Sequence, residues 1–190
     1  MTRILFIILI SINSLFCFGQ SNSDSSEISI WTPPSWFAGN KNLLSDNLKN
    51  YKLSQAENNI SFLLGVYYKY DPKVHVGFIP TIKFYIRQNK IKDFKKFFIS
   101  AKEDVESIKS HVTNFKYIDT PKTILAGQHK AFYTSLSYEL KIQTGEIANM
   151  RVKIIYIPFD NKRLEVTLID SDEEDCSNLY KEIINKIKVE

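Results

Sequence analysis

The chain has 190 residues, of which 44% are hydrophobic, and it contains 13 Phe and 10 Tyr. This composition excludes a disordered chain, because disordered chains are poor in aromatic and other apolar residues. The formal net charge of +4 is too small for a dedicated nucleic-acid-binding protein, whose basic residues form a concentrated face. We therefore expect a globular domain that binds no nucleic acid.

The first residues have the pattern of a secretory signal peptide. Arg3 precedes an apolar run at residues 4–12, and a polar tract begins at Ser21. The apolar run is too short for a transmembrane helix. We predict that residues 1–20 are a signal peptide and that the protein is exported, to the periplasm or the extracellular space. The residues before Cys17 lack the small side chain of lipoprotein signals, so we expect no lipid anchor.

Residues 28–190 contain no internal repeat and no linker, and we expect them to form one domain. Alternating residues at 28–32 predict a short strand that ends at Pro33. Residues 61–70 and 81–87 are rich in aromatic and β-branched side chains, which is typical of strands. Residues 38–58 are polar with spaced leucines, and their pattern leaves a short helix and an ordered loop equally open.

The middle of the chain predicts one helix and then a series of strands. Six apolar residues follow helical spacing: Phe94, Phe97, Phe98, Ala101, Val105 and Ile108. Short strands are predicted at residues 115–118 and 123–125. Long strands are predicted at residues 128–143, 149–158 and 163–169, and plausible hairpin turns at residues 144–146 and 159–162 join them.

A second helix is predicted at the end of the chain. Its apolar residues again have helical spacing: Cys176, Leu179, Tyr180, Ile183, Ile184 and Ile187. Ser171 and Glu174 have the spacing of a capping box, which predicts that the helix begins there. We expect Ile183 and Ile184 to be largely buried on the sheet. The whole series predicts an α+β domain with a mostly antiparallel sheet flanked by helices.

Two short motifs and the order of the elements carry a family resemblance. Ile30-Trp31-Thr32-Pro33 with Ser35-Trp36, and the stretch ILAGQHKA at residues 124–131, are similar to the opening motif and a strand start of the PsbP-like fold family. This family includes the PsbP/DcrB-type secreted domains. The resemblance implies an α/β/α sandwich and a non-enzymatic binding, assembly or adaptor function. The metal-binding residues of the photosystem members have no counterpart that can be placed in this chain.

No motif in the sequence predicts catalysis or a metal site. His75, His111 and His129 are not at metal-ligand spacing, and no Gly-x-Ser-x-Gly motif occurs. We therefore expect no enzyme, no cofactor and no metal. The spacing of four carboxylates leaves open whether they converge: Asp119, Glu139, Asp160 and Glu165. A hydrolase is accordingly the least favoured of three functional hypotheses.

The region between the two strand predictions at 61–70 and 81–87 is the predicted contact loop. Residues 71–80 place Val74, His75, Val76 and Phe78 between two prolines. Apolar side chains in a loop either form a contact patch or pack onto the sheet, and both interpretations remain open. The favoured function is a binding or adaptor domain for an envelope or secreted protein partner. The alternative is a carrier of a small apolar or lipid ligand, held between the sheet and this loop.

Overall fold

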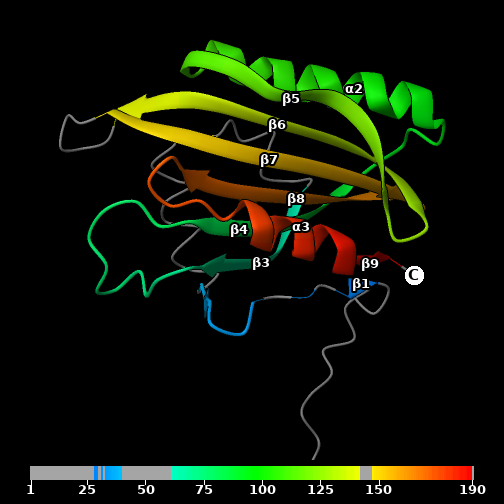
Figure 1. Ribbon diagram of the computed structural model, residues 1–190. Helices are drawn as coiled ribbons and strands as arrows, with labels where there is room; N and C mark the ends of the chain where they lie inside the picture. Colours follow the sequence, from blue (N-terminus) through cyan, green and yellow to red (C-terminus); the bar gives the residue numbers. More distant parts are fainter. Residues whose placement is uncertain (1–27, 30, 32, 40–60, 142–146, 190) are drawn as a thin grey trace, which may run out of the picture.

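The computed structural model describes residues 28–29, 31, 33–39, 61–141 and 147–189 (Figure 1). The predicted signal peptide, most of residues 38–58 and the predicted turn at 144–146 lie outside the described residues. The described strands are β1 (Ile28–Ser29), β2 (Phe37–Ala38), β3 (Ser61–Tyr68), β4 (Thr81–Gln88), β5 (Thr113–Ala126), β6 (His129–Lys141), β7 (Ile147–Phe159), β8 (Lys162–Ser171) and β9 (Lys188–Val189). The helices are α2 (Phe94–Ser107), the short 3₁₀ turn η2 (Ile108–Ser110) and α3 (Ser177–Lys186).

Seven of these strands form one antiparallel sheet in the order β2-β3-β4-β8-β7-β6-β5. β1 and β9 form a separate antiparallel pair, which brings the two ends of the described chain together. The predicted strands at 61–70, 81–87, 128–143, 149–158 and 163–169 correspond to β3, β4, β6, β7 and β8. The α+β fold class is therefore confirmed.

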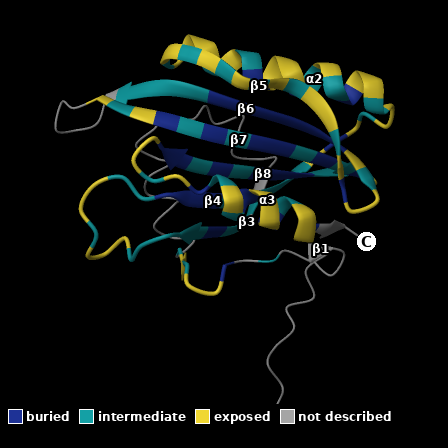
Figure 2. Cartoon of the chain, in the orientation of Figure 1, coloured by how far each residue is buried: buried dark blue, intermediate teal, exposed yellow. Residues whose placement is uncertain are grey.

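The two helices cover opposite faces of the sheet (Figure 1). α2 packs on Phe132, Leu136 and Val152, whereas α3 packs on a second cluster that includes Ile155 and Leu164. The central strands β6, β7 and β8 are dark over much of their length in Figure 2, because both of their faces are buried, whereas the edge strand β5 is mostly half-buried or exposed. The predicted arrangement of helices on the two faces of a sheet is present.

Local interactions explain where α2 begins and how it lies. The Asp93 side chain accepts a hydrogen bond from the Lys96 backbone N–H at 2.8 Å, which caps the helix. The buried face carries Phe97, Ala101 and Val105, which the helical spacing predicted. The predicted helix at residues 94–108 is confirmed to within one residue.

The prediction differs from the structure in β5. The short strands at 115–118 and 123–125 are parts of one strand, β5, whose pairing with β6 is interrupted by three register shifts. Bulges of this kind break the alternation of apolar and polar residues, which is why the sequence pattern indicates two short strands in place of one long strand. The turn that follows β5 contains Gly127 at φ +63°, a conformation that favours glycine.

The capping-box prediction at Ser171 and Glu174 is wrong. β8 continues to Ser171, which pairs with Met150, and α3 begins six residues later at Ser177. Two other carboxylates serve the start of the helix: Asp170 accepts from the Cys176 N–H at 2.9 Å, and Asp175 accepts from the Ser177 N–H at 2.8 Å. Sheet pairing therefore takes precedence over the local capping signal.

Among the described residues, no helix combines the length and the apolar character that a membrane span requires.

Candidate functional site

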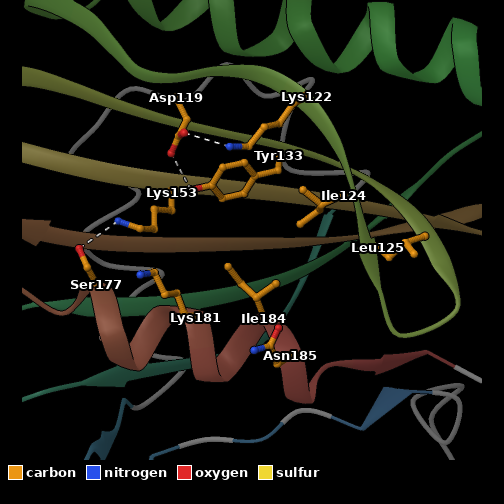
Figure 3. Close-up of a pocket in the computed structure, with 10 residues that line it drawn as sticks. All are labelled: Asp119, Lys122, Ile124, Leu125, Tyr133, Lys153, Ser177, Lys181, Ile184 and Asn185. Atoms are coloured by element: carbon orange, nitrogen blue, oxygen red, sulfur yellow. Dashed lines mark hydrogen bonds and ion pairs between the residues drawn. The ribbon is translucent and has the colours of Figure 1, made fainter.

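A groove lies between α3 and strands β5, β6 and β7 (Figure 3). The groove runs beside the whole of α3, because its lining includes Ser177 at the start of the helix and Asn185 near its end. One helix, about 10–12 Å wide, does not cover the full width of this face of the sheet. The uncovered part is hollowed to about 650 Å³. Its lining residues are Asp119, Lys122, Ile124, Leu125, Tyr133, Lys153, Ser177, Lys181, Ile184 and Asn185.

Three lysines from three different elements line the groove. Lys122 of β5 forms an ion pair with Asp119 at 2.9 Å. Lys153 of β7 donates a long hydrogen bond of 3.4 Å to the Ser177 hydroxyl, and its ammonium lies 5.7 Å from the centre of the Tyr180 ring. Neither Lys153 nor the exposed Lys181 has an ion pair with a carboxylate among the described residues. The groove thus holds more positive than negative charge.

One carboxylate, Asp119, is held on the wall of the groove by two neighbours. The hydrogen bond from Lys122 and a second one from the Tyr133 hydroxyl, at 3.1 Å, hold the pKa of Asp119 below its usual value. Burial, reinforced by the charge of Asp119, raises the pKa of Tyr133 to about 12. Asp119 is therefore ionised and Tyr133 neutral at pH 7, and both are already paired.

One end of the groove is more apolar than the other. Ile124 and Ile184 are half-buried, and Leu125 is 69% exposed. Figure 3 shows the Ile124 and Leu125 side chains on the same part of β5, across the groove from Ile184 and Asn185 of α3. The groove is therefore amphipathic, with Lys153 and Lys181 toward one end and the exposed Leu125 toward the other (Figure 3).

The four carboxylates whose convergence was left open do not form one site. Asp119 lines the groove on the α3 side, whereas Glu165 lies on the α2 side, bound to Arg87 and Arg163. Glu139 lines a separate hollow beside Arg151, and Asp160 lies in the β7–β8 turn. Within the described residues, no group of three or more His, Cys, Asp or Glu side chains has the arrangement of a metal site.

The four residues of the predicted contact loop lie in the connection from β3 to β4. Val74 and Val76 are 77% and 94% exposed. His75 stacks on Tyr70, with ring centroids 4.6 Å apart. Phe78 is half-buried and lines a small hollow beside the start of β7. The loop lies away from the groove, so the two places are separate candidate surfaces.

The sequence analysis missed the groove. Its residues come from four elements, and none belongs to a recognised motif. One signal was present: Arg151 and Lys153 alternate with apolar residues along β7, which places cations on a face that Ile155 otherwise buries. A lysine on such a face indicates that the face is not fully covered there, because lysine is almost never fully buried.

No protein-family model matches the chain, and no curated protein is similar to it. Among solved structures, LpqN of Mycobacterium tuberculosis, described as involved in cell envelope biogenesis, has a TM-score of 0.52 and 16% identity over 85% of this chain and 83% of LpqN. PA94 of Pseudomonas aeruginosa, a protein of unknown function and putative regulator, has a TM-score of 0.44 and 13% identity over 66% of this chain and 78% of that chain. The chain therefore shares its fold with a protein described as involved in cell envelope biogenesis.

Proposed function

We propose that the protein is an exported, non-enzymatic binding domain of the cell envelope, and that the groove beside α3 holds a small amphiphile with an anionic head group. One observation carries this proposal: three lysines, two of which form no ion pair among the described residues, line the same hollow as an exposed leucine. Its place in the envelope is supported by the signal-peptide pattern and by the shared fold with LpqN. The fold itself implies no activity.

The head group would lie between Lys153 and Lys181. Lys153 lies near Asp119 and Asp175, but neither lysine forms an ion pair among the described residues. Both ammonium groups therefore attract an anion, and the half-buried position of Lys153 reduces screening by salt. The Ser177 hydroxyl beside Lys153 adds a hydrogen-bond donor or acceptor. A carboxylate or a phosphate would satisfy these groups equally well.

The tail would lie along Ile124, Leu125 and Ile184. Covering exposed apolar surface contributes about 25 cal/mol per Å², so the exposed Leu125 is the side chain with most to gain. The volume of about 650 Å³ lies within the range of about 300–1,000 Å³ that is usual for small-molecule sites. A short acyl chain fits this size better than a protein segment, which needs a larger and flatter surface.

Titration with dodecanoate, below its micelle-forming concentration, tests the proposal. We expect saturable binding in calorimetry, and weaker binding of uncharged dodecanol. The double variant Lys153→Gln with Lys181→Gln should weaken dodecanoate binding about tenfold, which corresponds to about 1.4 kcal/mol. The matched control is Lys95→Gln with Lys102→Gln, because these exposed lysines lie on α2 at the opposite face of the sheet. Equal losses in both double variants, or equal binding of dodecanoate and dodecanol, would contradict the proposal.

A further inference from the structure

The connection from β3 to β4, residues 69–80, is held in place by bonds to the segment before α3. Lys69 forms an ion pair with Glu174, and the Tyr70 hydroxyl donates to Glu174 Oε1 at 2.8 Å. Within the loop, His75 stacks on Tyr70, and its backbone N–H donates to the Asp71 carbonyl at 3.0 Å. A loop fixed in this way loses little entropy when it binds a partner.

This fixed loop presents apolar side chains to solvent. Val74 and Val76 are 77% and 94% exposed, and Ile147 at the start of β7 is 64% exposed. The loop and the start of β7 lie at the same end of the sheet in Figure 2, where both are coloured as exposed. Three large aliphatic side chains at one end of the molecule are more than the scattered exposure of an ordinary surface.

A hollow of about 260 Å³ lies next to these side chains. It has an apolar part, formed by Phe78, Ile147 and Ala148, and an acidic part, formed by Asp172 and Glu173. The volume is below the range of about 300–1,000 Å³ for small-molecule sites and suits a single side chain. A lysine or arginine has the matching chemistry, because its aliphatic stem packs on apolar surface while its charged head reaches a carboxylate.

The charges around the hollow favour the same occupant. Asp172 and Glu173 are exposed, and the closest cation to Asp172 is Arg151 at 3.9 Å, which is itself bound to Asp170. Asp71 and Lys73 add one charge of each sign on the loop. Among the described side chains of this surface, acids therefore outnumber bases, which disfavours an anionic membrane as the occupant.

We infer that this surface, the docking patch of Val74, Val76, Phe78, Ile147, Asp172 and Glu173, binds a segment of a partner protein in which a basic side chain lies beside aliphatic ones. The basic side chain enters the hollow, and the aliphatic ones cover Val74 and Val76. Arginine is the better occupant, since it forms bidentate hydrogen bonds with carboxylates and often carries the binding energy of an interface. This surface is separate from the groove beside α3.

Fluorescence polarisation with two labelled ten-residue peptides tests the inference. In one peptide leucine alternates with arginine, and in the other glutamate replaces arginine. We expect the arginine peptide to bind at least tenfold more tightly. The double variant Asp172→Asn with Glu173→Gln, and separately Val76→Ser, should each weaken its binding at least fivefold. The control is Ile99→Ser with Glu103→Gln, which changes one exposed aliphatic residue and one exposed acid on α2.

Three results would overturn the inference. The first is equal affinity for the two peptides, or equal losses in the patch variants and the α2 control. The second is a dimer in sedimentation that Val76→Ser dissociates, which would make the patch a contact between two copies. The third is binding to vesicles of anionic phospholipid that Val76→Ser abolishes. Thermal melting of each variant checks that it folds. The Lys153→Gln with Lys181→Gln variant should bind the arginine peptide as tightly as the unchanged protein does. The peptide experiment therefore tests the docking patch alone, and a negative result would leave the proposed function of the groove intact.

Discussion

Buried charged side chains explain much of how the helices are fixed to the sheet. Glu165 is 5% exposed and accepts from Arg87 Nε at 2.8 Å, and its second oxygen pairs with Arg163 Nη2 at 2.6 Å. Arg163 also binds Asp104 of α2 at 2.8 Å and lies over the Tyr156 ring. Glu165, one of the carboxylates left open as catalytic, therefore links β4, β8 and α2. This is a structural role.

Asp170 has a comparable position on the α3 face. It is 1% exposed, pairs with Arg151 Nε at 2.9 Å through one oxygen, and accepts from the Cys176 N–H with the other. Arg151 Nη2 donates in addition to the Ser171 carbonyl at 2.6 Å. One buried carboxylate thus joins β7, β8 and the start of α3.

We predict that Asp170→Asn destabilises the protein by about 3 kcal/mol, because the substitution leaves the charge of Arg151 without its buried partner. Urea unfolding measures the loss. The control is Asp172→Asn, since that carboxylate is exposed and 3.9 Å from Arg151; it should change the free energy of unfolding by less than about 0.5 kcal/mol. Equal effects of the two substitutions would show that the Asp170 contacts do not fix the segment.

At the scale of the element, α3 has two neighbouring isoleucines with different roles. Ile183 is fully buried in the core between α3 and the sheet, whereas Ile184 is half-buried and lines the groove. The expectation that both are largely buried is therefore correct for Ile183 and needs correction for Ile184. Helical spacing places the two residues about 100° apart on the helix, and only one can point directly at the sheet.

We predict that Ile183→Ala costs about 2–5 kcal/mol, as large-to-small changes in a core do. Ile184→Ala should cost less than half of that amount, since the side chain is already partly in water, and it should weaken dodecanoate binding instead. Thermal melting and calorimetry on the two variants separate these effects. A larger stability loss for Ile184→Ala than for Ile183→Ala would contradict the assignment of Ile183 to the core and of Ile184 to the groove.

The same elements show what could be predicted from the sequence. Strands β3 and β4 follow from their aromatic and β-branched composition, and strands β6, β7 and β8 and helix α2 follow from local sequence pattern. β5 was divided because its bulges interrupt such a pattern, and the start of α3 was misplaced because the pairing of Ser171 with Met150 is not local. The groove could not be predicted, since its lining residues come from four elements that only the tertiary fold brings together.

At the scale of the whole molecule, the sheet separates two different regions. On the α2 side, Phe132 and Leu136 pack under the helix. The α3 side is closed over the middle strands and open beside β5, where the groove lies. The Trp31 and Trp36 side chains of the N-terminal motif pack against the α3-side core. The open side of this second layer is where we place binding.

The most direct test of that placement is amide chemical-shift mapping by NMR while dodecanoate is added to the isotope-labelled protein. We expect the largest shifts at Ile124, Leu125, Lys153, Lys181 and Ile184, and no change along α2. Shifts spread evenly over both faces, or confined to α2, would contradict the claim that the groove beside α3 is the binding site.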